Sequence, residues 1–142
     1  MAIPLPGELY FDRTNFGGHF FIVGPEDPCD ESNVVVFYCT SKQHDRDHPH
    51  TSACLVNHNL PAFFLPPDTL QSLPKPTWIK LDEPSYICKQ RFESERAFQK
   101  NKRDALPIKL TVALLRCGAE SVCMPRMDAA ACTRLANLME SV

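Results

Sequence analysis

The chain has 142 residues, a formal net charge of −2 at pH 7 and 23% charged residues. This length argues for a single domain over residues 1–142, and the charge argues against a strongly basic nucleic-acid binder. Leu, Ile, Val and Phe make up about a quarter of the chain, above the roughly 20% below which chains fail to bury a core. No run of about 20 apolar residues is present, so we expect no membrane partner and no transmembrane segment.

The cysteines bear on the cellular compartment. The sequence has 7 of them, an odd number, and Cys39, Cys88 and Cys132 lie inside apolar runs. We therefore expect most cysteines to be reduced, buried, small hydrophobic residues in a cytoplasmic protein. The start of the chain also lacks the basic and apolar regions of a secretory signal. A disulfide framework is the weaker alternative, because a chain of this length can build a core without one.

The first part of the chain has the composition of short strands. Most of the 13 prolines of the chain come before residue 85, and prolines oppose long helices there. Residues 8–12, 19–24 and 34–39 are predicted strands, and 34–39 is apolar on both faces and should be central. Gly17-Gly18 predicts a turn before the second strand, and 25–33 is predicted as a turn-rich acidic loop.

Shorter elements follow a polar segment at 42–52. Residues 53–56, 77–81 and 86–88 are predicted strands. Residues 68–73, bounded by prolines, are predicted to form one helical turn.

The last part of the chain reads as helical. Residues 94–103 are charged and have helical composition, and the apolar run 108–115 predicts a helix that stops at Gly118, with a strand as the open alternative. Residues 128–141 form the clearest predicted helix, with Asp128 as its N-cap. Strands first and helices last predict an α+β fold, in which a small barrel or curled sheet (about 1–90) is covered by a helical extension (about 91–142).

The segment 17–42 carries a motif of known type. Gly18-His19 opens an apolar strand, a loop follows, and a second apolar strand ends in Thr40-Ser41. This pattern resembles the MazF/PemK family of toxin endoribonucleases, which have a small SH3-like β-barrel. The later elements of the family would correspond to Cys54-Leu55, Trp78-Ile79 and Ser85-Tyr86-Ile87, so that the resemblance covers about residues 7–88.

The resemblance implies a toxin that cleaves single-stranded RNA without a metal or another cofactor. It also implies a homodimer and an antitoxin-like protein partner. Family members often place an arginine directly after Gly-His, where this chain has Phe20, and Arg46-Asp47 is adjacent rather than spaced as in the PemK-type pair. The resemblance therefore implies the fold more directly than the activity. A catalytically silent barrel that binds RNA or a protein partner is the alternative.

Three residues are the candidate catalytic groups. RNA cleavage without a metal needs a base for the ribose 2′-OH, a donor for the phosphoryl oxygens and an acid for the leaving 5′-oxygen. His19 is the candidate acid or base, because imidazole titrates near pH ~6.5. Thr40 and Ser41 are candidate hydroxyl donors at the end of a central strand. The plainer alternative is that all of them only cap turns and strand ends.

Three further residues are candidates for substrate binding. Gly18 lets the backbone approach a phosphate closely, and Lys42 and Arg46 would supply positive charge from the following loop. If the strands of His19 and Thr40 are antiparallel neighbours, the start of one strand meets the end of the other. The sequence therefore predicts a site at one rim of the sheet.

A second group of candidate ligands lies in the polar segment and just after it. Its members are His44, His48, His50, Cys54 and His58. The last three are spaced by four residues, as on one face of a helix, and their side chains suit zinc. Pro49 opposes a regular helix, however, and the pattern has no Cys-x2-Cys pair. We therefore expect an exposed polar loop and no metal site.

Positive charge concentrates between residues 89 and 109, where seven basic residues face three acidic ones. Such a segment is a candidate nucleic-acid face, with Phe92 and Phe98 as stacking residues. The alternative is a solvated helix face, with both phenylalanines packed onto the barrel.

Overall fold

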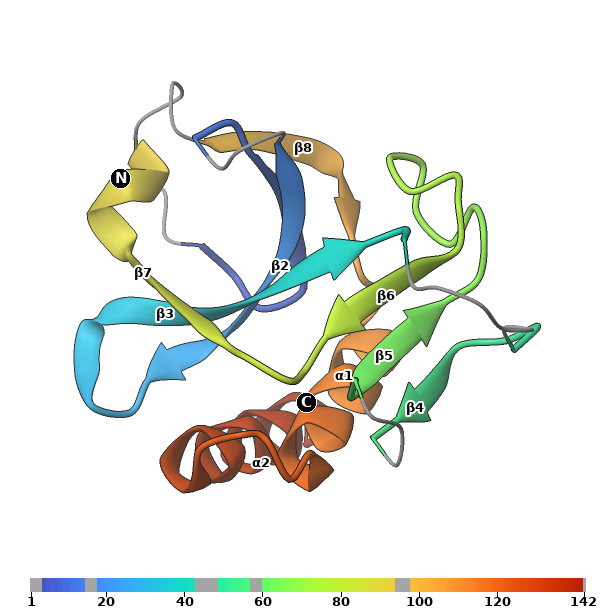
Figure 1. Ribbon diagram of the computed structural model, residues 1–142. Helices are drawn as coiled ribbons and strands as arrows, with labels where there is room; N and C mark the ends of the chain where they lie inside the picture. The colour runs from blue at the N-terminus through green and yellow to red at the C-terminus, as the bar shows by residue number, and fades with distance from the viewer. Residues whose placement is uncertain (1–3, 15–17, 43–48, 57–59, 94–97, 142) are drawn as a thin grey trace.

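The computed structural model describes residues 4–14, 18–42, 49–56, 60–93 and 98–141. The strands are β1 (Glu8–Asp12), β2 (His19–Asp27), β3 (Asp30–Thr40), β4 (Ala53–Leu55), β5 (Ala62–Leu65), β6 (Thr77–Lys80), β7 (Ser85–Cys88) and β8 (Phe98–Ala105). The helices are the 3-10 helix η1 (Lys89–Glu93) and the α-helices α1 (Ile108–Glu120) and α2 (Arg126–Glu140). The predicted α+β fold is confirmed, since the strands form one curled sheet and both α-helices lie on one side of it (Figure 1).

The sheet is antiparallel, with the order β4-β5-β6-β3-β2-β1-β8, and β7 pairs with β3 off this path. The strands predicted at 8–12, 19–24, 34–39, 53–56, 77–81 and 86–88 are confirmed as β1, β2, β3, β4, β6 and β7. As predicted, β3 is central, because it pairs with β2, β6 and β7. The strand β5, which lies between two proline-containing turns, was not predicted from the sequence.

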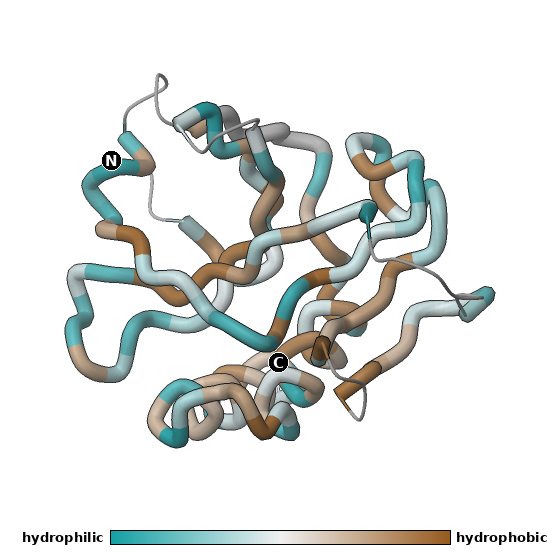
Figure 2. Tube along the Cα trace, viewed as in Figure 1, coloured by the Kyte–Doolittle hydropathy of each residue, from teal (hydrophilic) through white to brown (hydrophobic). Residues whose placement is uncertain are grey.

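Successive side chains along the central strands point to opposite sides of the sheet, and both sides are apolar. One face carries Leu9, Ile22, Val35 and Phe37, and it packs against α1 and α2. The opposite face carries Tyr10, Phe21, Val36 and Ile87, and it packs against Phe92 and Phe98. Figure 2 shows hydrophobic residues along the crossing strands and mostly hydrophilic ones around the tip of the β2–β3 hairpin. Both faces of the sheet are therefore covered, as a doubly apolar central strand requires.

Two predicted connections are wrong. The segment 25–33 is mostly strand, because β2 and β3 continue as a hairpin, and irregular registers between Val23 and Asp27 accommodate Pro25. The segment 68–73 is not a helical turn. Its buried Leu70 and Leu73 form an isolated β-bridge, and Asp68 has a φ of 63°.

The helical prediction for 94–103 is also wrong where the structure describes that segment. Residues from Phe98 onward form β8, which pairs with β1 and places Phe98 beside Asp12. This pairing supplies backbone partners to an otherwise open edge of β1, which outweighs a weak helical propensity. The β part of the fold therefore extends to Ala105, and the helical part begins at Ile108.

The two α-helices form as predicted. The C-terminal end of α1 and the N-cap of α2, however, differ from those predicted. Gly118 does not stop α1. It is buried inside the helix, and Ser121 is the C-cap. Asp128 does not cap α2. It lies in the first turn after Pro125, buried, where it accepts a hydrogen bond from the Tyr86 hydroxyl. Local sequence rules place both residues at a helix terminus, but in the fold each of them is buried in contacts with other elements.

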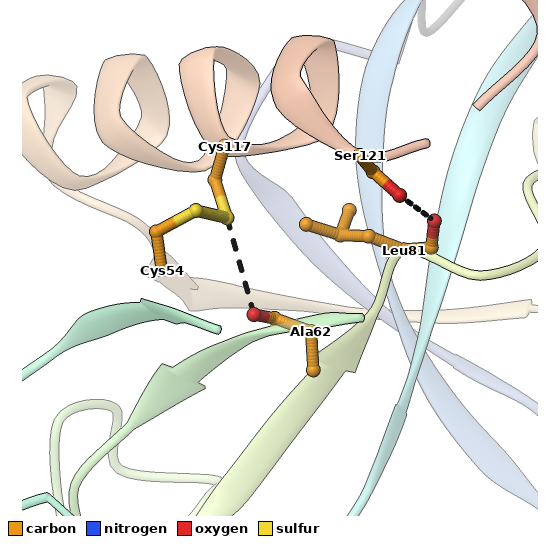
Figure 3. Close-up of a disulfide and its surroundings, with 5 residues drawn as sticks. All are labelled: Cys54, Ala62, Leu81, Cys117 and Ser121. Carbon is orange, nitrogen blue, oxygen red and sulfur yellow. Dashed lines mark hydrogen bonds between the residues drawn. A yellow bond between two sulfur atoms is a disulfide. The ribbon is translucent and has the colours of Figure 1, made fainter. Parts of the chain in front are cut away.

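A disulfide bond joins the helices to the sheet. Cys54 of β4 and Cys117 of α1 are bonded, with their Cα atoms 5.5 Å apart (Figure 3). Most cysteines were expected to be reduced, and this pair is the exception. The other cysteines are free: Cys39 and Cys132 are buried as predicted, Cys88 is half-buried, and Cys29 and Cys123 are exposed.

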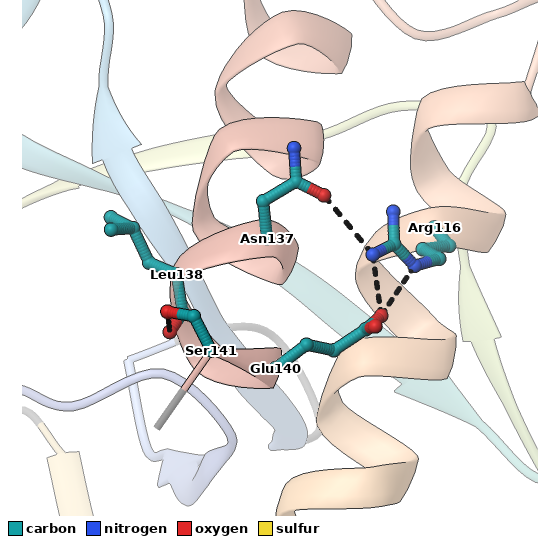
Figure 4. Close-up of polar contacts among 5 residues, drawn as sticks. All are labelled: Arg116, Asn137, Leu138, Glu140 and Ser141. Atoms are coloured by element: carbon teal, nitrogen blue, oxygen red, sulfur yellow. Dashed lines mark hydrogen bonds and ion pairs between the residues drawn. The ribbon is translucent and has the colours of Figure 1, made fainter.

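Polar contacts hold the two α-helices together at their solvent side. Arg116 of α1 donates from Nε to Glu140 of α2 (2.7 Å) and from Nη2 to Asn137 (3.1 Å) (Figure 4). The Ser121 hydroxyl after α1 donates to the Leu81 carbonyl oxygen (2.9 Å) (Figure 3). None of the helices in the described ranges is both long and apolar enough to cross a membrane.

Candidate functional site

A pocket of about 550 Å³ opens where β2 begins and β3 ends. It is lined by Phe11, Gly18, His19, Phe20, Cys39, Thr40, Ser41, Lys42, Ser72, Leu73, Pro74, Lys75 and Thr77. The structure thus brings together all the candidate site residues except Arg46, which lies outside the described residues. Their shared position at one rim was expected from the sequence, whereas their chemical roles remain predictions.

The antiparallel pairing of β2 and β3 explains why His19 and Thr40 meet. Phe21 is the register partner of Tyr38 and Ile22 that of Phe37, so the same register carried to the strand ends places His19 opposite Thr40. His19 is exposed and Thr40 is half-buried. The Thr40 hydroxyl oxygen accepts a hydrogen bond from the Lys42 backbone N–H (3.1 Å). This contact caps the strand end and leaves the hydroxyl hydrogen free to donate to a ligand.

Gly18 brings the backbone close to an aromatic ring. Its φ is +71°, and a Cβ atom built there would lie 2.4 Å from Cζ of Phe11. Phe11 meets Phe20 edge to face, with the ring centroids 4.9 Å apart. Both rings are half-buried and form an apolar wall of the pocket, which a side chain at position 18 would displace.

The opposite wall is a loop that the sequence analysis missed. The backbone N–H groups of Gln71 and Ser72 donate to the two carboxylate oxygens of Asp104 on β8, at 3.2 and 2.7 Å. The Thr77 hydroxyl donates to the Lys75 carbonyl oxygen (3.0 Å). Lys75 therefore stands on an anchored loop at the pocket mouth. Its position between Pro74 and Pro76 was the available signal, because prolines restrict the backbone on both sides of the cation.

The pocket combines apolar walls with cations and hydroxyl groups. Lys42 and Lys75 are exposed cations at its rim, and Ser41 and Ser72 add hydroxyl groups. Among the described residues that line it, none carries a carboxylate. The Cys39 thiol in its wall stays neutral, because burial raises its pKa to about 12. Positive charge, hydroxyl donors and aromatic rings together suit a phosphate-bearing ligand that has flat bases.

The described part of the histidine-rich segment does not form the helical face of zinc ligands that its spacing suggested. Cys54 is in a disulfide bond and lies on a strand, so its sulfur is not a thiolate ligand on a helix face. His50 is exposed, and His44, His48 and His58 lie outside the described residues. Within the described ranges, no cluster of three His, Cys, Asp or Glu side chains is arranged to hold a metal ion.

The basic segment is not a stacking face. Phe92 and Phe98 are buried against Phe21 and Tyr10, as the alternative for these residues predicted. Comparisons of the chain with protein-family models, with curated proteins and with solved structures found no match. The fold and site define an α+β protein with a cation- and hydroxyl-lined pocket at the rim of its sheet. The functional conclusion therefore depends on the chemistry of that pocket.

Proposed function

We propose that the pocket binds single-stranded RNA and that the chain is a metal-independent endoribonuclease with an SH3-like barrel, similar to the MazF/PemK toxins. The observation that supports this proposal is the convergence of His19, Thr40, Ser41, Lys42 and Lys75 on one pocket. A base, hydroxyl donors and cations are the groups that the reaction requires, and none of them depends on a metal.

In the proposed reaction, His19 accepts the proton of a ribose 2′-OH, and the 2′-oxygen attacks the adjacent phosphorus. The Thr40 and Ser41 hydroxyls and the Lys42 ammonium group stabilise the negative phosphoryl oxygens. The bond from phosphorus to the 5′-oxygen breaks, and this oxygen takes a proton from Lys75. The products are a 2′,3′-cyclic phosphate and a free 5′-hydroxyl group.

The pocket walls favour a single strand over a duplex. Phe11 and Phe20 line the same pocket as the cations, with their rings edge to face, and unstacked bases can pack against such rings. In a duplex the bases are stacked on one another, so their faces would not be available to these rings.

RNA binding without cleavage is the second candidate function. Phe20 lines the pocket at the position where MazF/PemK toxins, which the sequence pattern resembles, often have an arginine. His19 is also the one imidazole among the described lining residues, so a lysine must act as the general acid. Both observations are compatible with a pocket that binds RNA but leaves it intact.

Incubation of the purified chain with mixed-sequence single-stranded RNA in EDTA tests the proposal. We expect fragments with cyclic phosphate ends, and we expect cleavage to be lost in His19→Ala and Thr40→Ala. His50→Ala is the matched control, because His50 is an exposed histidine that does not line the pocket. Intact RNA that is still shifted on a native gel would support the second candidate. Intact RNA without a shift would contradict both.

A cytoplasmic location, a homodimer and an antitoxin-like partner belong to the same proposal. The disulfide Cys54–Cys117 weighs against a strongly reducing compartment, because cytosolic thiols are normally kept reduced. Trapping free thiols at the moment of cell lysis decides this point. A reduced pair supports the cytoplasm, and a bonded pair contradicts it.

A further inference from the structure

A guanidinium group lies near the pocket without lining it. Arg91 is exposed in the middle of η1, the short yellow helix in Figure 1. Its guanidinium carbon is 4.8 Å from the centroid of the Phe98 ring, and Phe98 is only 4% exposed. Its Nη2 atom also donates to the Thr14 hydroxyl oxygen (3.4 Å). The buried ring and the hydroxyl therefore hold the guanidinium in place.

The registers of three strands connect this guanidinium to His19. Asp12 of β1 is the register partner of Phe98 on β8 and of His19 on β2. Register partners share a face and neighbouring strands are about 4.8 Å apart, so the backbones of Phe98 and His19 are about 10 Å apart. Arg91 and the pocket therefore flank the same end of the sheet.

The carboxylate of Asp12, between Phe98 and His19, accepts its hydrogen bonds from residues other than Arg91. Asp12 is 4% exposed and accepts hydrogen bonds from the Tyr38 hydroxyl (2.6 Å), the Thr14 backbone N–H (2.9 Å) and the Thr14 hydroxyl (2.7 Å). Thr14 thus stands between Asp12 and Arg91. A guanidinium has five N–H donors, and Thr14 takes one of those of Arg91, so the exposed group can still bind an anion.

We propose that Arg91 forms a second phosphate subsite, which binds another phosphodiester of the RNA strand whose cleavable phosphate lies in the pocket. The inference rests on the proposed function and extends it. The pocket binds one phosphate beside the exposed His19, and the strand continues around the rim of the sheet, outside the buried side chains of Asp12 and Phe98, to the guanidinium. Arginine suits this role because its planar fork matches two phosphate oxygens.

Binding of two RNA ligands to the full chain in EDTA tests the subsite. One ligand is a fluorescent single-stranded decamer with 2′-methoxy groups, which cannot be cleaved, and the other is uridine 3′-monophosphate, which fills the pocket alone. Arg91→Gln removes the charge, and Arg91→Lys keeps the charge and most of the stem. Arg134→Gln is the matched control, because Arg134 is an exposed arginine on α2, away from η1 (Figure 1).

We expect Arg91→Gln to weaken decamer binding about 3- to 10-fold. The slope of log K against log salt concentration should become shallower by about 0.7, the value for one phosphate contact on a single strand. Binding of the mononucleotide should be unchanged, Arg91→Lys should be intermediate on the decamer, and Arg134→Gln should match the wild type. Circular dichroism confirms that each variant is folded.

Three results overturn the inference. Decamer binding by Arg91→Gln that equals that of Arg134→Gln shows that Arg91 contacts no phosphate, and the proposed function then stands without the subsite. Equal weakening of both ligands shows that Arg91 acts on the pocket itself. A wild-type chain that binds neither ligand rejects the proposed function together with the subsite.

Discussion

Gly18 sets the shape of the pocket through its backbone conformation. Its φ of +71° is one that other residues rarely adopt, and an added Cβ atom would lie 2.4 Å from the Phe11 ring. We expect Gly18→Ala to lower the free energy of unfolding by about 1–3 kcal/mol and to weaken RNA binding. Denaturant unfolding measures the first effect, and a variant as stable as the wild type would contradict this account.

Gly118 provides the matched control for Gly18. It lies inside α1, and a Cβ atom there would meet no atom closer than 3.5 Å among the described residues. Alanine is favoured over glycine in a helix by up to about 1 kcal/mol. Gly118→Ala should therefore leave the chain equally stable or more stable in the same unfolding experiment.

The thiols of the chain should differ in reactivity. Burial raises the pKa of Cys39 and of Cys132 to about 12, so at pH 8 only about one thiol in ten thousand is the reactive thiolate. Cys29 and Cys123 are exposed. We expect a thiol reagent at pH 8 to label the two exposed cysteines first, with peptide mass spectrometry as the readout. Early labelling of Cys39 would contradict the buried pocket wall.

Part of the candidate site could be predicted from the sequence. The rim shared by His19 and Thr40 follows from antiparallel pairing of two strands that the sequence shows clearly. Lys75 comes to the pocket through a loop whose path depends on Asp104, more than 20 residues further along the chain. The two prolines that flank Lys75 are a local signal of a restricted backbone, but no local pattern encodes the contact with Asp104, so the position of this cation at the pocket was not predicted.

At the scale of elements, the loop from Pro66 to Lys75 depends on β8. Asp104, 3% exposed, accepts hydrogen bonds from two backbone N–H groups of this loop. Asp104→Asn replaces one acceptor with a donor, so we expect a loss of about 1–3 kcal/mol in the free energy of unfolding. Hydrogen exchange at Gln71 and Ser72 should also become faster.

Asp30→Asn is the control for this prediction. Asp30 also accepts a backbone N–H, that of Ser32 (3.0 Å), but it is exposed at the start of β3. Exposed substitutions of this kind usually change stability by less than about 0.5 kcal/mol. Equal effects of the two variants would mean that the Asp104 contacts do not anchor the loop.

Elements were predicted well where the side chains alternate or are uniformly apolar, as in β2 and β3. The prediction failed for β8, whose charged sequence favours a helix until pairing with β1 is considered. It failed for the segment 68–73 because Leu70 and Leu73 are fixed by burial, not by a repeating backbone. Local propensity decides an element only when no partner strand or core competes for it.

At the scale of the whole molecule, the disulfide Cys54–Cys117 ties the helical layer to the edge of the sheet across 63 residues of sequence. We expect the double variant Cys54→Ser, Cys117→Ser to lose about 2–4 kcal/mol of free energy of unfolding. A reducing agent should lower the stability of the wild type by a similar amount and leave the variant unchanged. Cys123→Ser, an exposed free cysteine, is the control. Equal stability of all three proteins would contradict a structural disulfide.

The order of elements predicted the overall architecture, with strands first and helices last. The doubly apolar segment 34–39 also predicted that both faces of the sheet are covered, but the order of elements did not show that the helices cover one face and that Phe92 and Phe98 lie over the other. Alternation of the side chains creates the two faces, and the fold of the chain brings distant segments over each of them (Figure 1). The pocket lies at the rim where the two faces end, and this position gives it groups from both.

The central claim is that RNA binds at this rim, and NMR of the isotope-labelled chain tests it most directly. On addition of the non-cleavable RNA decamer, we expect the backbone amide signals of His19, Thr40, Lys42, Ser72 and Lys75 to shift, while those of α2 stay in place. Signals that do not move at all, or shifts confined to the helices, would contradict the account.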